Sequence, residues 1–332
     1  MKMPSQQAVQ GAAVHAKEVG EMTRELPPFG YDIPTSMTEI LTRGGSAAGN
    51  SAVQAYLSCP EYSRLRSMGV TRKRRTCVID GIPDELDYLD YGSLMHALMA
   101  VRVVYGYEVA ESLLDKDTGP LELCAADRLK AFHLLKTYDQ TYPLNQEPFD
   151  YLGIEVEVVS DVSTIIDLAR GFKGYHDGTM PPTLRTVRYD HLVRFRDDPE
   201  RGIIDDGIYS LETKTAARAG QMQQYLVQFA VQIAIWNSNS QLVEQYGRMR
   251  GVIPNQLVKT EVPKCERLAP VYGSSRLERL AADYLSLPDR IEYPMAFDGA
   301  YARMLHSCWG KYRPCQYIGL CWENSQGDYE SR

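Results

Sequence analysis

The sequence predicts an α/β protein with a mixed central sheet flanked by helices, an N-terminal helical insertion and a C-terminal cysteine-rich segment. Three observations predict this class. Hydrophobic residues before residue 150 recur mostly at helical spacing, residues 152–162 and 207–216 alternate as strands do, and residues 217–236 carry an apolar helical stripe. The chain has 332 residues, which is enough for one large domain or two.

The first half of the chain is predicted to contain an arm and then helices. Residues 1–45 mix Ala, Gln, Glu, Pro and Gly with little periodicity, which indicates a flexible N-terminal arm. Residues 46–150 form a helical region in which helices are expected from Gly49 onward, over 91–115 and over 124–138.

The strands lie in the next region, residues 151–260, and a C-terminal segment, residues 261–332, follows it. In the first strand the apolar residues share one face and Glu155 and Glu157 share the other, which is typical of a half-buried strand. A glycine-bracketed stretch, GFKGYHDGTM, then contains Asp177. A polar, proline-containing segment continues to about residue 206.

Composition and charge narrow the function classes. Hydrophobic residues make up 44% and charged residues 24%, as in ordinary globular proteins, and no run of about 18 apolar residues predicts a membrane span. The N-terminal stretch lacks the apolar core of a signal peptide, so we expect a cytoplasmic protein. In a reducing compartment the seven cysteines favour free thiols or metal ligands over disulfides.

One basic run stands out from the net charge of −7. The stretch RLRSMGVTRKRR, residues 64–75, has six basic residues and no acidic one. It is either a solvated surface or a local patch that contacts DNA phosphates. The residues of this candidate DNA-binding patch are Arg64, Arg66, Arg72, Lys73, Arg74 and Arg75.

The strand GIYSLETKTA, residues 207–216, places a carboxylate beside an ammonium. Alternate residues of a strand share a face, so Glu212 and Lys214 point the same way and Thr213 points the other way. A lone Glu-x-Lys is most often a surface ion pair. Metal-dependent phosphodiester hydrolysis, however, needs carboxylates to hold Mg²⁺ or Mn²⁺ and a cation nearby.

Asp177 would complete this set if its strand lies next to the Glu-x-Lys strand, and the carbonyl of Thr213 would add an oxygen. The gap between Asp177 and Glu212 is long, since it spans residues 178–211. Three later residues are therefore alternatives for the first carboxylate, namely Asp190, Asp205 and Asp206. Either Glu155 or Glu157 would supply an extra carboxylate.

The predicted helix over 217–236 carries a polar stripe beside its apolar one. The apolar stripe consists of Met222, Leu226, Phe229, Ile233 and Trp236. The polar stripe consists of Gln221, Tyr225, Gln228 and Gln232. It is either the boundary of an exposed face or a contribution to the site at the end of the preceding strand.

Taken in order, these elements resemble the PD-(D/E)XK nuclease superfamily, which implies a restriction-endonuclease-like core. ETKT resembles the strand end of the RecB-type branch. YGSLMHALMA resembles its upstream Gly-x-x-x-His element, and SAVQAYLSCPEYSRLR its opening helix. The resemblance covers roughly residues 50–325.

The resemblance assigns roles to single residues. It implies catalytic roles for Asp177, Glu212, Lys214 and Gln228, and metal ligation by His96, Asp177, Glu212 and Thr213. Taken alone, a histidine such as His96 on an apolar helix is more often a core residue. The family pairs its helix Gln with a Tyr four residues later, but Gln228 is followed by Gln232, and Tyr225 precedes it.

Three cysteines near the C-terminus, Cys308, Cys315 and Cys321, lie within fourteen positions. Such a trio needs a fourth ligand for a tetrahedral zinc or a four-cysteine cluster. His306 is a zinc candidate. The resemblance implies a structural 4Fe-4S cluster in which Cys59 is the fourth ligand, and Zn²⁺ remains the alternative.

The function implied is a metal-dependent DNA nuclease, with exonuclease favoured over endonuclease. It would act with Mg²⁺ or Mn²⁺ on single-stranded or duplex DNA ends in recombination, repair, phage DNA processing or CRISPR-associated DNA processing, with a recombinase or helicase as a candidate partner. The alternative is a catalytically silent nuclease fold with a metal–sulfur centre that binds DNA or a recombination partner.

Overall fold

The computed structural model describes residues 33–42, 70–72, 86, 88–169, 183–196, 207–216, 225–286 and 329–331. Several predicted site residues lie outside these ranges. They are Asp177, Asp205 and Asp206, the cysteines Cys59, Cys308, Cys315 and Cys321, and the basic residues Arg64, Arg66, Lys73, Arg74 and Arg75.

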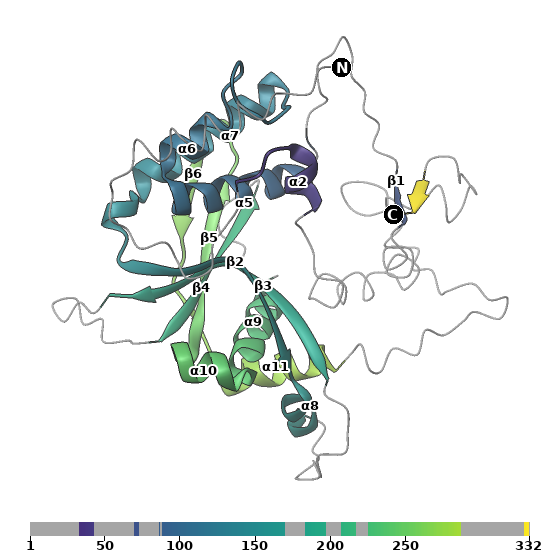
Figure 1. The fold of residues 1–332 in the computed structure, drawn as a ribbon. Helices are drawn as coiled ribbons and strands as arrows, with labels where there is room; N and C mark the ends of the chain where they lie inside the picture. Colours follow the sequence, from purple (N-terminus) through teal and green to yellow (C-terminus); the bar gives the residue numbers. More distant parts are fainter. Residues whose placement is uncertain are drawn as a thin grey trace.

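A six-stranded mixed sheet forms the centre of the described structure (Figure 1), which confirms the predicted α/β class. The strands are β2 (Phe149–Asp161), β3 (Leu184–Phe195), β4 (Ile208–Ala216), β5 (Met249–Val258), β6 (Lys264–Arg267) and β7 (Val271–Tyr272). Their order is β2-β3-β4-β5-β6, with β7 also pairing with β5. Only the β4–β5 pair among these is parallel. Parallel neighbours need a crossover connection, and helices α9 and α10 lie in it.

Helices cover both faces of this sheet (Figure 1). The helices on one face are α5 (Tyr88–Tyr105), α6 (Tyr107–Ser112) and α7 (Ala125–Thr141). Those on the other are α9 (Leu226–Ser238), α10 (Ser240–Tyr246) and α11 (Ser275–Leu285). The short elements are α2 (Met37–Thr42), α8 (Ser163–Ala169) and the 3₁₀ helix η1 (Leu144–Gln146).

The predicted helix over 91–115 is wrong as one continuous element. It is divided between α5 and α6 at Gly106, which has φ 97°. This left-handed conformation is accessible to glycine at little cost and interrupts the helical hydrogen-bond pattern. The helix expected over 124–138 is confirmed as α7.

Strand β3 occupies the segment that the sequence suggested to be only a polar, proline-containing connection. Val187 and Tyr189 are buried at alternate positions. Arginines between and beside these two residues obscured the alternation in the sequence. In the structure these arginines form ion pairs and hydrogen bonds. Arg188 pairs with Glu157 of β2, and Arg185 donates to the carbonyl of Leu285.

Apolar packing fixes α9 against the sheet. The predicted stripe is confirmed at Phe229, Ile233 and Trp236, which are buried in a cluster shared with β2, β3 and α11. Full burial of such a side chain contributes about 1.5–3 kcal/mol. The adjacent polar stripe of α9 is thereby held toward β4. Because α11 packs on α9, the packed core extends past residue 260.

Two short strands lie apart from the main sheet. β1 (Val70–Arg72) pairs antiparallel with β8 (Tyr329–Ser331). This pair brings a segment from the first quarter of the chain together with one at its end. Among the described residues, no helix combines the length and the apolar character that crossing a membrane requires.

Candidate metal and catalytic site

Strands β2 and β3 carry a pair of carboxylates at an irregular point. Glu155 has φ 51°, a left-handed backbone that residues with a Cβ rarely adopt. Ile154 packs in the cluster beneath α5, whereas Val156 packs in the cluster beneath α9. Residues two apart share a face in a regular strand, so β2 changes face at Glu155. The β2–β3 register places Asp190 beside Glu155, and strained positions of this kind are common at functional sites.

Helix α5 brings a histidine to these two carboxylates. His96 Nδ1 lies 3.3 Å from Asp190 Oδ1 and 3.9 Å from Glu155 Oε1. One ligand atom from each of the three residues falls within 4.8 Å of the others. Imidazole nitrogen together with carboxylate oxygen is a suitable donor set for Mn²⁺ or Mg²⁺. The three side chains therefore form a group that could hold a divalent cation.

The backbone of β4 holds the second oxygen of Asp190. The amide N–H of Thr213 donates to Asp190 Oδ2 at 2.7 Å, and both residues are buried. This contact ties the carboxylate on β3 directly to the Glu-x-Lys strand. Asp190 is the candidate for the first carboxylate that lies within the described residues, and this contact places it beside Glu212 and Lys214, on the strand that neighbours β4.

Glu212 and Lys214 lie on the face of β4 that α9 covers. Lys214 Nζ is 2.5 Å from Glu212 Oε1, and Gln228 donates to the same oxygen. Gln232 donates to Glu212 Oε2 at 2.6 Å. Gln228 and Gln232 are four residues apart, so they lie on one face of the helix and both reach the carboxylate. Both glutamines of the polar stripe, Gln228 and Gln232, therefore contact Glu212. Tyr225 lies beside them, with its ring centroid 5.5 Å from Lys214 Nζ.

Electrostatics at the site is dominated by an excess of carboxylates. Burial and the Asp190 carboxylate raise the pKa of Glu155 to about 7, and the same two causes raise the pKa of Glu212. Burial alone would raise the pKa of Asp190, but His96 and Lys214 hold it well below its usual range. Burial would lower the pKa of His96, but Asp190 and Glu155 raise it to about 9. We call this group of five the acidic cluster.

Two other predicted residues lie away from the acidic cluster. Glu157 is 46% exposed at its side chain and lies 3.4 Å from Arg188. The change of strand face at Glu155 explains why these two glutamates separate. Arg72 lies in β1, which pairs with β8 outside the main sheet.

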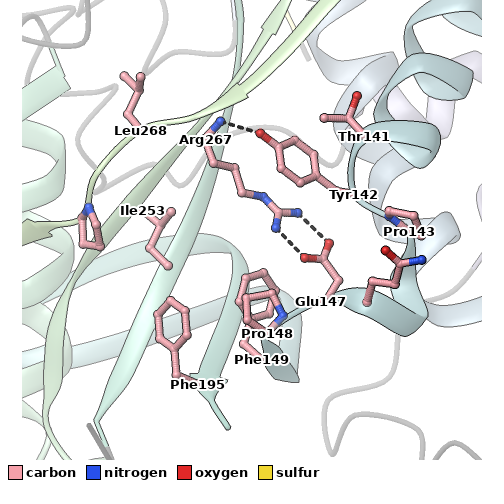
Figure 2. A pocket seen from close by; sticks show the side chains of 12 residues that line it. Thr141, Tyr142, Pro143, Glu147, Pro148, Phe149, Phe195, Ile253, Arg267 and Leu268 are labelled. Atoms are coloured by element: carbon pink, nitrogen blue, oxygen red, sulfur yellow. Dashed lines mark hydrogen bonds and ion pairs between the residues drawn. The ribbon is translucent and has the colours of Figure 1, made fainter. Parts of the chain in front are cut away.

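A second buried charged group was not anticipated from the sequence. Arg267 of β6 binds both carboxylate oxygens of Glu147, and its backbone N–H donates to Tyr142 Oη at 2.9 Å (Figure 2). Its Nη2 also donates to Tyr138 Oη at 2.6 Å. We call these four residues the arginine cluster, and three of them, Arg267, Glu147 and Tyr142, line a pocket of about 360 Å³. Arg267 and Glu147 are 120 residues apart, so no local motif could have indicated their pairing.

Fold and site together define an α/β protein with a carboxylate-rich centre on a mixed sheet. No protein-family model matches the chain, and no curated protein matches it. The solved structures that match include a putative exonuclease from Eubacterium rectale, which is 9% identical. The match covers 87% of this chain and 85% of that one at a TM-score of 0.35. A likeness at this TM-score carries no weight for function, which has to be inferred from the geometry of the site.

Proposed function

We propose that the chain is a metal-dependent nuclease that hydrolyses phosphodiester bonds in DNA. The observation that carries this proposal is the gathering of Glu155, Asp190 and Glu212 around Lys214 and His96. Burying carboxylates without enough positive charge is costly. A divalent cation would supply that charge, and hydrolysis of a phosphodiester is chemistry that such a cation and a lysine perform together.

His96, Glu155 and Asp190 would hold the cation, since their donor atoms already converge. A cation bound there would neutralise phosphate charge and lower the pKa of a bound water. Asp190 would be the first carboxylate, because it contacts both His96 and the Thr213 amide. Asp177 stays the alternative. Glu212 and the Thr213 carbonyl are the further ligands that the resemblance implies.

The remaining residues would orient the reacting groups. Lys214 carries a proton, because burial would lower its pKa but Glu212 and Asp190 raise it. Its ammonium would donate a hydrogen bond to the phosphate or to the attacking water. Gln228 and Gln232 fix Glu212 from the α9 side, and Glu212 in turn fixes Lys214. Such outer contacts maintain catalytic geometry.

Exonuclease action on DNA ends, in recombination, repair or phage DNA processing, is the finer proposal, and it rests on the RecB-type resemblance. A structural 4Fe-4S cluster on Cys59, Cys308, Cys315 and Cys321 belongs to the same proposal. What supports it is the β1–β8 pair, because β1 begins eleven residues after Cys59 and β8 begins eight residues after Cys321. Anaerobic purification followed by iron and zinc analysis tests it: about four irons are expected, and one zinc with no iron would contradict the cluster.

Cleavage of end-labelled single-stranded and duplex DNA with Mn²⁺ or Mg²⁺ tests the nuclease proposal. Wild-type protein is expected to degrade the DNA, EDTA to stop it, and Lys214→Ala to bind DNA without cleaving it. The positions of the label in the products distinguish attack at ends from internal cuts. DNA binding by wild type with no cleavage under either metal would contradict the proposal and favour the catalytically silent alternative.

A further inference from the structure

A row of polar side chains crosses three neighbouring strands behind the acidic cluster. Thr213 of β4 is in register with Asn255 of β5, and Asn255 is in register with Arg267 of β6. Thr213 and Asn255 are fully buried. Tyr138 of α7, also fully buried, contacts the row from above the sheet.

Hydrogen bonds join the members of this row into one chain. Asn255 Nδ2 donates to Thr213 Oγ1 at 3.1 Å and to Tyr138 Oη at 3.2 Å. Arg267 Nη2 donates to the same Tyr138 oxygen at 2.6 Å. The chain therefore runs without interruption from the arginine cluster to the Glu-x-Lys strand.

The far end of the row is rigidly anchored. Figure 2 shows the guanidinium of Arg267 facing the Glu147 carboxylate, with both oxygens engaged. The guanidinium carbon lies 4.0 Å from the centre of the Tyr142 ring, a stacking arrangement that arginine favours. Bidentate pairing and stacking leave the Arg267 side chain little conformational freedom. Its hydrogen bond therefore holds Tyr138 in place, and Tyr138 in turn holds Asn255.

Stability alone does not explain the row. Asn255 Oδ1 is buried and has no hydrogen-bond partner among the described residues. A half-satisfied buried amide is less favourable than an apolar side chain of the same shape. Polar rows of this kind instead specify one geometry. The geometry specified here is that of Thr213, whose N–H holds Asp190 at 2.7 Å.

We infer that Asn255 is a positioning residue for the metal site: it fixes Thr213, and through the Thr213 amide it fixes Asp190. The inference rests on the proposed function, since it concerns the same cation. Asn255 would touch neither the cation nor DNA. Tyr138 and Arg267 hold Asn255 in place.

Titration of purified protein with Mn²⁺, followed by electron paramagnetic resonance of the free ion, tests the role of Asn255. Asn255→Leu keeps the shape of the side chain and removes the amide. We expect its Mn²⁺ affinity to fall about tenfold, as for other residues that orient metal ligands. Circular dichroism before titration establishes that the variant is folded.

Asn237→Leu is the matched control. Asn237 also joins a helix to β5, because it exchanges two hydrogen bonds with the backbone of Met249, but it contacts none of the row. This variant is expected to melt at a lower temperature with wild-type Mn²⁺ affinity. Equal affinity in wild type and Asn255→Leu would overturn the inference while the proposed function stands. Absence of Mn²⁺ binding in wild type would overturn both.

Tyr138→Phe provides a second variant in case Asn255→Leu does not fold. It removes only the hydroxyl that joins Asn255 to Arg267. A threefold loss of Mn²⁺ affinity is expected, because Asn255 keeps its contact with Thr213. Thr213→Ser retains the hydroxyl and should restore affinity relative to Thr213→Val. Identical affinities in that pair, with Tyr138→Phe equal to wild type, would contradict the positioning role.

Discussion

The acidic cluster and the arginine cluster lie on the same sheet, yet they differ in charge. In the arginine cluster one guanidinium meets one carboxylate with ideal complementarity. In the acidic cluster three carboxylates share one ammonium and one imidazole. A balanced buried pair neutralises its own charge. The unbalanced cluster has the excess negative charge that the proposed cation would neutralise.

The pKa shifts follow the same division. Burial would lower the pKa of Arg267, but its hydrogen bonds to Glu147 raise it, so the charged pair is mutually stabilised. Glu155 has a pKa raised to about 7 by burial and by Asp190, so its charge is disfavoured where it stands. Perturbation by like charges is typical of functional sites. The contrast distinguishes a structural ion pair from the cluster proposed to bind a cation.

The largest expected effect is on activity. Asp190→Asn removes a carboxylate that contacts both His96 and the Thr213 amide. We expect its DNA cleavage rate to fall about a thousandfold, equivalent to about 4 kcal/mol of transition-state stabilisation. Steady-state cleavage of end-labelled DNA measures it. Asp177→Asn, measured in parallel, sharpens the assignment: if it alone abolishes cleavage, the first carboxylate is Asp177.

The next effect falls on stability. Glu147→Gln leaves Arg267 buried without a charged partner and should lower the free energy of unfolding by about 3 kcal/mol. Urea denaturation followed by circular dichroism measures this value. The folded variant should lose far less activity than Asp190→Asn. A variant that unfolds like wild type would remove the distinction between the clusters.

A smaller loss is expected at the helix side of the site. Gln232→Leu removes the donor to Glu212 Oε2 and keeps the volume of the side chain. We expect cleavage to fall about thirtyfold, within the range of residues that orient catalytic groups. Gln228→Leu should behave similarly, since Gln228 binds the other oxygen. If only Gln228→Leu slows cleavage, the role of orienting Glu212 belongs to Gln228 alone.

The smallest effect has the opposite sign. In metal-free protein, Glu155→Gln removes a disfavoured charge and should raise the free energy of unfolding by about 1 kcal/mol while activity falls, a trade-off common at active sites. Glu157→Gln is the control, since its exposed pair with Arg188 contributes little. Thermal melts in EDTA compare the two. Destabilisation by Glu155→Gln would show that the acidic cluster is a structural one.

Local patterns predicted the parts of the site that lie within single elements. The alternation of Glu212 and Lys214 on one strand and the four-residue spacing of Gln228 and Gln232 were readable because each depends on neighbours in sequence. The sequence did not indicate which aspartate lies beside Glu155, because this depends on the β2–β3 register and on the left-handed backbone at Glu155.

The polar row had no signal in the sequence for a related reason. It depends on the parallel register of β4 and β5, which places Thr213 beside Asn255, and on the antiparallel register that adds Arg267. These residues are far apart in the chain and belong to no shared motif. The Gly106 break was visible only as a glycine within a helical pattern, and its positive φ is what ends the helix.

Mn²⁺ binding to wild type and to Asp190→Asn, measured by electron paramagnetic resonance on metal-stripped protein, tests the central claim most directly. The carboxylate excess predicts that wild type binds the ion at the acidic cluster and that Asp190→Asn binds it at least tenfold more weakly. Equal binding by both, or no binding by wild type, would contradict a metal site at His96, Glu155 and Asp190.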